Sequence, residues 1–442
     1  MKEYRIIKGF SKLSEEEKRR MVATGLEDAA GAEASMRSFH HPDQDMQKVL
    51  NGFSENTLTN FPMPFGVAPN FVVNGKVYMV PMVIEESSVV AAASSAASFW
   101  AVRGGFEAEV VSVEKTGQLH FLYDGDPDVL KEAEKDLFAY LLKWVRPITI
   151  GMESRGGGIL NMQIKHLPDI SANYFQLHVT FNTVDAMGAN FINSVLEELG
   201  AGLQEYLDQT PGLSAQDAEP LMAILSNYTP NCLVRVSVAC TIDELGVING
   251  MPPAGFVRRF TQAVDVARSD VYRAVTHNKG IMNGVDAVVI ATGNDFRAVE
   301  AGVHAYASRS GTYQSLSRAH EKNGRFQFTL DIPLALGTIG GLTSLHPIAA
   351  LALRILGNPS AQELMMVAAS AGLANNFAAV RSLVTTGIQA GHMRMHLPNI
   401  LQQHQASEEE TKQAMAWFAE KKVSHRAVED FLRDIRKKGT AT

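Results

Sequence analysis

The chain has 442 residues, which is too long for one ordinary hydrophobic core, so two or three structural units are expected. Hydrophobic residues make up 46% and charged residues 20% of the chain, a composition that fits a globular protein and excludes a disordered one. The net charge is −7, and nothing in the sequence indicates a surface for nucleic acid or for an anionic membrane.

The cysteines and the N-terminal sequence both predict a cytoplasmic protein. Cys232 and Cys240 are too few for a disulfide framework, and free thiols suit a reducing compartment. The N-terminal sequence MKEYRIIKGFSKLSEEEKRR contains no apolar core of signal-peptide length. The longest apolar stretch, around 89–102, is interrupted by serines and is too short to span a bilayer. No membrane span is therefore expected.

The first elements in chain order are helices, a hairpin and a buried helix. Residues 1–60 are polar and predicted to be helical. Residues 71–80 alternate around an Asn-Gly pair, which predicts a β-hairpin. Ser87 or Ser88 is expected to cap an Ala-rich helix that runs to Arg103. Because that helix is apolar around most of its circumference, it is expected inside the protein.

From residue 107 to residue 231 short β-like runs alternate with longer helix-like runs. This pattern predicts a small α/β unit inserted into a larger one, which would comprise residues 1–106 and 232–388. Residues 389–442 form a polar tail in which Ser407 opens the first of two capped helices with a capping box. The β-like runs are 107–113, 118–123, 162–166, 174–181 and 232–240.

Two acids, Glu85 and Glu86, stand between a strand and a helix that both look buried. A carboxylate at this place could simply cap the N-terminus of the helix. It could also be a carboxylic acid whose pKa is raised by apolar surroundings, which would suit proton donation near neutral pH. The residues alone leave both interpretations open.

A second polar segment, 270–284, concentrates hydrogen-bond donors, among them Arg273, Lys279 and Asn283, in a stretch that ends in small residues. One interpretation is a polar loop. The other is a cationic pocket for an anionic substrate, in which Lys279 stabilises a developing oxyanion.

Two further places hold single candidates. Asp295 ends a Gly-Asn-Asp string after the apolar run 287–290, which is predicted to be a strand, and an acid there is either catalytic or part of a turn. His392 follows a glycine at the entry to the polar tail. A lone histidine is more often structural, but on a mobile segment it could close over a substrate as a general acid.

The usual dinucleotide fingerprint, Gly-x-Gly-x-x-Gly after a first strand, is missing, and residues 155–158 do not fit it. Two other glycine-bearing segments remain, 185–190 and 337–341. In the first, Gly188 could let backbone amides at a helix start approach a pyrophosphate. No His, Cys and Asp cluster has metal-ligand spacing and no nucleophile elbow is present, so no metal is expected.

Taken in this order, the segments closely resemble 3-hydroxy-3-methylglutaryl-coenzyme A (HMG-CoA) reductases of the bacterial class, class II. The resemblance extends from about residue 9 to residue 400, and the Thr-Thr-Glu-Gly signature of the eukaryotic class is absent. It is specific because several long and unusual strings recur in one order. They are Glu55-Asn56, Asn70, Glu85-Glu86 with Ser88–Ser94, Asp185–Asn190, Arg273–Gly284, Gly293–Asp295, Gly340-Gly341 and Gly391-His392.

The resemblance assigns roles to residues of this chain at matching positions. The catalytic positions of the family are matched by Glu86, Lys279, Asp295 and His392. The positions that contact the substrate are matched by Ser88, Arg273, Asn283 and Asn227. The cofactor segment is matched by Asp185, Met187, Gly188 and Asn190.

The resemblance also implies an α+β fold with three parts. A large, mostly helical domain for substrate binding and dimerisation would surround a buried central helix. The inserted small α/β domain, ferredoxin-like rather than Rossmann-type, would bind the dinucleotide, and residues 389–442 would form a C-terminal helical flap. The implied assembly is a homodimer with active sites shared across the interface, or a higher oligomer built from it.

The implied reaction is the four-electron reduction of HMG-CoA to mevalonate and coenzyme A by two NAD(P)H, a step of the mevalonate pathway of isoprenoid biosynthesis. In that reaction Lys279, with Asp295 beside it, would stabilise the thioester oxyanion. Glu86 would supply protons, and His392 would protonate the departing coenzyme A thiolate.

NADPH is favoured over NADH, because no acid clearly occupies the ribose position whereas Lys143, Arg146 and Arg155 lie nearby. Three alternatives stay open: the same enzyme run toward mevalonate degradation with NAD, another acyl-coenzyme A enzyme such as a lyase or thioesterase, and a catalytically silent homologue. The chain departs from the family at Thr59, where Gly is usual, and at Ser87, where Pro is usual. Both changes concern loop geometry rather than a reacting group.

Overall fold

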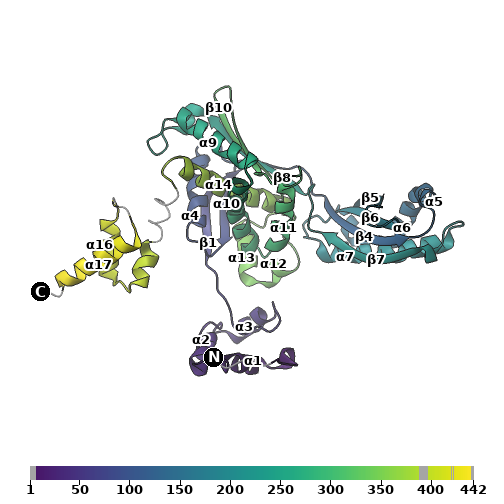
Figure 1. The fold of residues 1–442 in the computed structure, drawn as a ribbon, viewed down its shortest axis with the longest axis horizontal. Helices are drawn as coiled ribbons and strands as arrows, with labels where there is room; N and C mark the ends of the chain where they lie inside the picture. The colour runs from purple at the N-terminus through teal and green to yellow at the C-terminus, as the bar shows by residue number, and fades with distance from the viewer. Residues whose placement is uncertain (1–5, 388–396, 420, 422, 440–442) are drawn as a thin grey trace.

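The computed structural model describes residues 6–387, 397–419, 421 and 423–439. It is a mixed α/β fold in which a central body carries three peripheral parts (Figure 1). The N-terminal helices lie below the body in this view, a small α/β unit extends to the right, and the C-terminal helices lie to the left.

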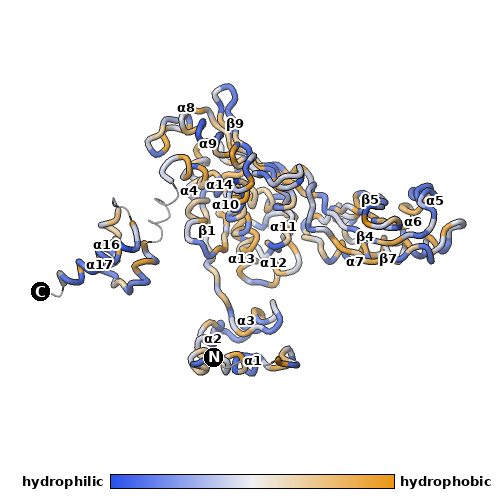
Figure 2. The backbone as a smooth tube through the Cα atoms, viewed as in Figure 1, coloured by the Kyte–Doolittle hydropathy of each residue, from blue (hydrophilic) through white to orange (hydrophobic). Residues whose placement is uncertain are grey.

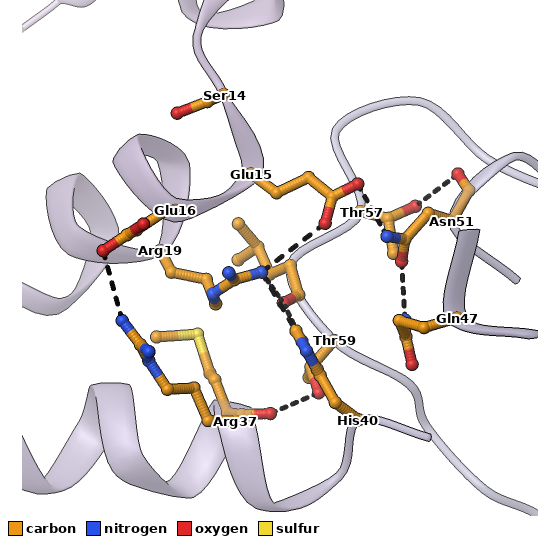
Figure 3. Close-up of polar contacts among 12 residues, drawn as sticks. Ser14, Glu15, Glu16, Arg19, Arg37, His40, Gln47, Asn51, Thr57 and Thr59 are labelled. Atoms are coloured by element: carbon orange, nitrogen blue, oxygen red, sulfur yellow. Dashed lines mark hydrogen bonds and ion pairs between the residues drawn. The ribbon is translucent and has the colours of Figure 1, made fainter. Parts of the chain in front are cut away.

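The N-terminal part is a set of short helices held together by polar contacts. Ser14 and Glu17 form a reciprocal capping box at the start of α1. Thr59, one of the departures from the family pattern, donates a hydrogen bond of 2.5 Å to the carbonyl oxygen of Met36 (Figure 3). Thr59 therefore anchors the segment that leaves this part. The elements are η1 (Phe10–Lys12), α1 (Glu15–Ala23), α2 (Ala29–Ser38) and α3 (Gln44–Asn51).

The predicted hairpin and Ala-rich helix are both present. Strands β1 (Phe65–Val73) and β2 (Lys76–Val83) pair in antiparallel fashion. Asn74 and Gly75 both have positive φ at the turn, as a two-residue hairpin of the right twist requires. Helix α4 (Val89–Ala101) follows and packs on β1. One face of α4 is buried in the body, at Val89, Ala93, Ala96, Ala97 and Trp100. Ala91, Ser95 and Ser98 are exposed, so α4 is less enclosed than its composition predicts.

The core of the body is a four-stranded antiparallel sheet packed against long helices. The strand order is β3-β8-β10-β9, and α10 and α14 contact each other along the centre of the body. Figure 2 shows hydrophobic residues concentrated along these two helices. The strands are β3 (Glu107–Val110), β8 (Leu233–Thr241), β9 (Ser317–Lys322) and β10 (Arg325–Pro333). The helices are α8 (Ile242–Leu245), α9 (Pro253–Ser269), α10 (Val271–Ala291), α11 (Phe296–Ala307), α12 (Leu342–Leu345), α13 (Pro347–Ile355) and α14 (Ala361–Val384).

The body differs from the sequence-based expectation in three respects. The run 287–290, predicted to be a strand, is the last turn of α10, and the polar segment 270–284 is helical rather than a loop. Short apolar runs fit a buried helix and a buried strand equally well, so periodicity could not separate them. Strand β3 pairs with β8 of the body, although residues 107–110 were grouped with the small unit. Strands β9 and β10 add a sheet component to a unit that was expected to be mostly helical.

Helix α14 is long and apolar enough to cross a membrane, and 83% of its most apolar window is buried inside the fold. From the sequence, residues 89–102 were expected to be the longest apolar stretch, but α14 is longer. Burial of most of its surface is what the apolar composition of a core helix requires.

The small unit is an antiparallel sheet with two helices on one face. Its sheet order is β5-β6-β4-β7, and α6 and α7 bury their apolar sides on it. The element order β-α-β-β-α-β is that of a ferredoxin-like unit, not of a parallel doubly wound sheet. The elements are β4 (Lys115–Tyr123), α5 (Pro127–Glu132), α6 (Glu134–Glu153), β5 (Gly158–His166), β6 (Tyr174–Asn182), α7 (Ala189–Gln209), η2 (Ala215–Asp217) and β7 (Ala218–Ser226).

The C-terminal part has a hydrophobic core of its own. Residues 397–403 are helical, followed by α16 (Glu408–Trp417) and α17 (His425–Gly439). Ser407 forms the predicted capping box with Glu410 at the start of α16. The apolar side chains of the three helical segments pack on one another. This part is therefore a compact helical unit of its own.

Candidate active site

Glu86 and Lys279, two residues far apart in the sequence, face each other in the body. The Nζ atom of Lys279 on α10 lies 3.1 Å from Oε2 of Glu86, which precedes α4. Ser88 donates a hydrogen bond of 2.9 Å to the other carboxylate oxygen of Glu86. Ser88 is the N-cap residue of α4, but its side chain makes no capping hydrogen bond. Of the two open interpretations, the geometry favours a carboxylate that serves a site.

These side chains line a cavity of about 470 Å³ between α4, α10 and α14. Because α10 is a helix, residues three or four positions apart share one face. The hydrogen-bond donors of the polar segment 270–284 lie on the face of α10 that lines the cavity. Glu85 is exposed, and Glu86 is the acid that faces the cavity. The sequence-predicted residues that line it are Glu86, Ser88, Arg273, Lys279 and Asn283.

The cavity has an excess of positive charge. Among the described residues that line it, Arg273, Lys279 and Arg381 are cations and Glu86 is the one carboxylate. The side chain of Glu86 is 29% exposed, so the fully apolar surroundings expected from the sequence are not present. Cations that converge on a cavity attract anions. An anionic substrate therefore fits this site.

Arg381 was not identified from the sequence. It lies on α14, donates a hydrogen bond of 2.9 Å to Ser95, and places its guanidinium 5.5 Å from the ring of Phe377. Burial lowers the pKa of Arg381 from its ordinary value, although a guanidinium stays charged at neutral pH. The signal that could have revealed it is a single arginine in an otherwise apolar helix.

His277 also lines the cavity and was not assigned a role from the sequence. Its Nε2 lies 2.6 Å from Oγ of Ser317, and Ser317 donates to Oδ1 of Asn376 at 2.9 Å. Burial, with the charge of Arg273 nearby, lowers the pKa of His277 to about 4. The ring is therefore neutral at pH 7 and ties α10 to β9 and α14.

Asp295 does not lie beside Lys279, contrary to the mechanism expected from the sequence. It caps α11 by accepting from the amides of Arg297 and Ala298, and it pairs with the guanidinium of Arg297 at 3.0 Å. The hydrogen bond from Arg297 lowers the pKa of Asp295. Lys279 and the end of α10 are separated by twelve residues, or on the order of 18 Å along the helix. In the structure of one chain the two side chains do not meet.

The expected cofactor segment lies between the small unit and the body. Gly188 has φ +91° at the start of α7, and an added Cβ would lie 2.4 Å from the Thr183 side chain, so only glycine fits. Asp185 accepts from the amide of Ala361 at 2.7 Å, which gives its carboxylate a structural partner. The two glycine-bearing segments meet here, because the amide of Thr338 donates to the carbonyl of Asp185.

The segment fits a dinucleotide diphosphate. The N-terminus of α7 has no side-chain cap, so its first amides are available to an anion. Asn190 is exposed on the first turn. Met187 lines a small cavity of about 30 Å³ together with Asn227 and Lys115. Asn227, expected to contact substrate, therefore lies beside the cofactor segment rather than in the larger cavity.

The two remaining sequence-based predictions are the catalytic role of His392 and the absence of a bound metal. His392 and the glycine before it lie outside the described residues. Across the described parts of the chain, no group of three or more His, Cys, Asp or Glu side chains is arranged to hold a metal ion.

Comparison with known proteins gives one family. The model of the family described as hydroxymethylglutaryl-coenzyme A reductase matches residues 14–397. The 3-hydroxy-3-methylglutaryl-coenzyme A reductase of Archaeoglobus fulgidus is 35% identical over 400 residues, covering 89% of this chain and 86% of the relative. A probable reductase of the same name from Borreliella burgdorferi is 31% identical over 395 residues, with 89% and 86% covered.

Solved structures give the same result. The 3-hydroxy-3-methylglutaryl-coenzyme A reductase of Streptococcus pneumoniae superposes with a TM-score of 0.72 at 33% identity, covering 97% of this chain and 99% of that one. A class II structure from the same organism, bound to NADPH in open conformations, has a TM-score of 0.71 at 34% identity, with 85% and 99% covered. The family match spans most of the sequence, and two of the four expected catalytic residues, Glu86 and Lys279, line the cavity. This chain belongs to the hydroxymethylglutaryl-coenzyme A reductase family.

Proposed function

We propose that the chain reduces HMG-CoA to mevalonate and coenzyme A with two molecules of NAD(P)H. The observation that carries the proposal is the cationic cavity in which Lys279 and Glu86 face each other 3.1 Å apart. A thioester reduction needs a cation where the oxyanion develops and a proton donor within reach of the same oxygen. Lys279 supplies the cation and Glu86 the proton donor, and the two lie side by side.

The substrate is held by the cations and donors around that pair. Arg273 binds the carboxylate of the hydroxymethylglutaryl group, since a guanidinium and a carboxylate match in charge and geometry. Ser88 and Asn283 contact the tertiary hydroxyl and the carbonyl from opposite walls of the cavity. Lys279 then stabilises the thioester oxyanion. Glu86 supplies a proton to this oxygen when the thioester is reduced to the hemithioacetal, and again when the aldehyde, left after coenzyme A departs, is reduced to mevalonate.

The dinucleotide binds at Asp185, Met187, Gly188 and Asn190, where it supplies the hydride. The small unit, predicted as residues 107–231, serves as the cofactor domain. Its boundary with the body is placed near 111–114, because β3 pairs with β8 of the body and β4 belongs to the sheet of the small unit. NADPH is preferred, since Lys143, Arg146 and Arg155 are exposed on α6 or just beyond it. Such cations attract a ribose 2′-phosphate.

The active unit is a homodimer in which Asp295 of one copy completes the site of the other. Lys279 lies twelve residues before the end of α10 and Asp295 lies beyond that end, so the two side chains do not meet within one chain. Val271, Tyr272 and Val275, on the first two turns of α10, are 44%, 89% and 51% exposed, and a group of exposed apolar side chains is typical of an interface. Residues 389–442 act as a flap that brings His392 to the departing thiolate.

The test is an assay of the purified chain with HMG-CoA and NADPH. Oxidation of two NADPH per HMG-CoA, with mevalonate and free coenzyme A as products, is expected. Release of coenzyme A without NADPH oxidation would overturn the proposal in favour of a lyase or thioesterase, and no turnover would indicate a silent homologue. Steady-state comparison of NADPH with NADH, and of reduction with mevalonate oxidation, decides the cofactor and the direction.

A further inference from the structure

Lys115, at the start of β4, is a buried cation with neutral partners. The residue is 5% exposed, and its Nζ donates to Oγ1 of Thr183 at 2.6 Å and to the carbonyl oxygens of Ala186 at 2.8 Å and Met187 at 3.0 Å. An ammonium has three protons to donate, and these three acceptors use all of them. Lys115 belongs to none of the sequence strings that carry the family resemblance.

None of these three acceptors carries a negative charge that would compensate the positive charge of Lys115. A hydroxyl and two carbonyls are neutral, and the nearby thiol of Cys232 is neutral as well, because burial raises its pKa to about 11. Burial also lowers the pKa of Lys115. Burying an ammonium is costly unless something compensates for it. A lysine buried in this way is therefore expected to have a role other than packing.

The contacts explain the conformation of the cofactor segment. In a trans peptide the C=O and the N–H point in opposite directions. The hydrogen bond that draws the Met187 carbonyl toward Lys115 therefore turns the amide of Gly188 away from it, toward the open N-terminus of α7. Thr183 reinforces the arrangement by donating to the carbonyl of Ala186 at 2.7 Å.

We propose that Lys115 is a positioning residue for the cofactor. It holds the carbonyls of Ala186 and Met187 inward so that the amides at the start of α7 face the diphosphate of the dinucleotide. Its charge adds to the positive end of the α7 dipole and is compensated when the diphosphate binds. This inference rests on the proposed function, because it takes the segment 185–190 to be the diphosphate site.

The test compares Lys115→Met, which keeps the length of the side chain and removes its charge, with Lys135→Met, which removes an exposed lysine of α6 in the same unit. Lys115→Met should raise the KM for NADPH by about ten-fold or more and leave the KM for HMG-CoA within about two-fold of wild type. Thr183→Val, which removes one of the three acceptors, should produce a smaller rise. Lys135→Met should change neither constant.

A purely structural role predicts a different result. It would lower Tm and shift both constants together, and that outcome, or an unchanged KM for NADPH in folded Lys115→Met, overturns the proposal. Amide hydrogen exchange of Met187–Asn190 without cofactor gives a readout independent of turnover, and Lys115→Met should accelerate it. Faster exchange in a chain that oxidises no NADPH would uphold the positioning role and reject the proposed function. Unchanged exchange rejects the positioning role in either case.

Discussion

The ion pair of Glu86 and Lys279 is better suited to chemistry than to stability. The side chain of Lys279 is 62% exposed and that of Glu86 is 29% exposed. Exposed ion pairs contribute between zero and about 1 kcal/mol to folding. A pair that adds so little to stability, yet lies in a cationic cavity, is expected to be dispensable for the fold and required for turnover.

Lys279→Ala should therefore lower kcat by about a hundred-fold or more, as removal of an oxyanion donor typically does, with little change in Tm. Lys76→Ala is the matched control, because Lys76 pairs with Glu363 at the same 3.1 Å and at similar exposure but outside the cavity. Turnover and thermal unfolding measured on both variants test the assignment. Near-normal kcat in folded Lys279→Ala would contradict it.

Arg381 should contribute to substrate affinity. Arg381→Met keeps the apolar contact with Phe377 and removes a cation from the cavity, so the KM for HMG-CoA should rise by about ten-fold. Arg103→Met is the control, because Arg103 also stacks on Phe99, at 3.8 Å, while binding backbone carbonyls. If both variants give the same KM, Arg381 serves packing alone.

At the scale of elements, the position of α10 depends on a buried polar network. His277, Ser317 and Asn376 link α10 to β9 and α14, and Asn376 also donates to the carbonyl of His277 at 3.3 Å. Such a network holds the Lys279 face of α10 against the cavity. Protonation of His277 is expected to destabilise this network, because the buried ring is neutral in the folded chain.

Folding stability should fall as the pH is lowered from about 6.5 to about 4. The pKa of His277 is about 4 in the folded chain against about 6.5 when unfolded. In this window the unfolded chain binds the proton and the folded chain does not, so acid favours unfolding, by about 3 kcal/mol at the lower end. Urea unfolding of wild type and His277→Gln across pH 4–7 measures it. The difference between the two chains should change with pH, and parallel curves would contradict the prediction.

At the scale of the whole molecule, one chain does not bring together the three expected catalytic residues that the structure describes. Asp295 lies at the N-terminus of α11, paired with Arg297, while Glu86 meets Lys279 near the middle of α10. A mechanism that uses all three needs a second copy. The homodimer, like the cytoplasmic location, stays a prediction from the sequence.

Complementation tests the shared site. Lys279→Ala and Asp295→Asn should each be inactive alone, and Asn keeps the capping role at α11. In a random mixture half of the dimers are mixed, and each mixed dimer carries one site with both residues intact. Co-expression should thus restore about a quarter of wild-type activity. No recovery, in samples shown to contain mixed dimers, would place both residues in the same chain.

The C-terminal unit is expected to act only in the thioester step. If His392 protonates the coenzyme A thiolate, His392→Gln should reduce free mevaldehyde far better than HMG-CoA, because the aldehyde has no thiol to release. Assays with each substrate, with circular dichroism to confirm folding, measure the difference. Equal losses on both substrates would leave His392 an anchoring role.

The sequence alone determined the local features and the family. Capping at Ser407, the Asn74-Gly75 turn and the presence of the Ala-rich helix depend on residues close together in the chain, so spacing and side-chain chemistry were enough. The tertiary structure decided what depends on distant contacts. It decided that residues 287–290 are helical, that Glu86 meets Lys279 while Asp295 does not, and that Arg381 and Lys115 line the two cavities. These features follow from packing between elements, which no local pattern encodes.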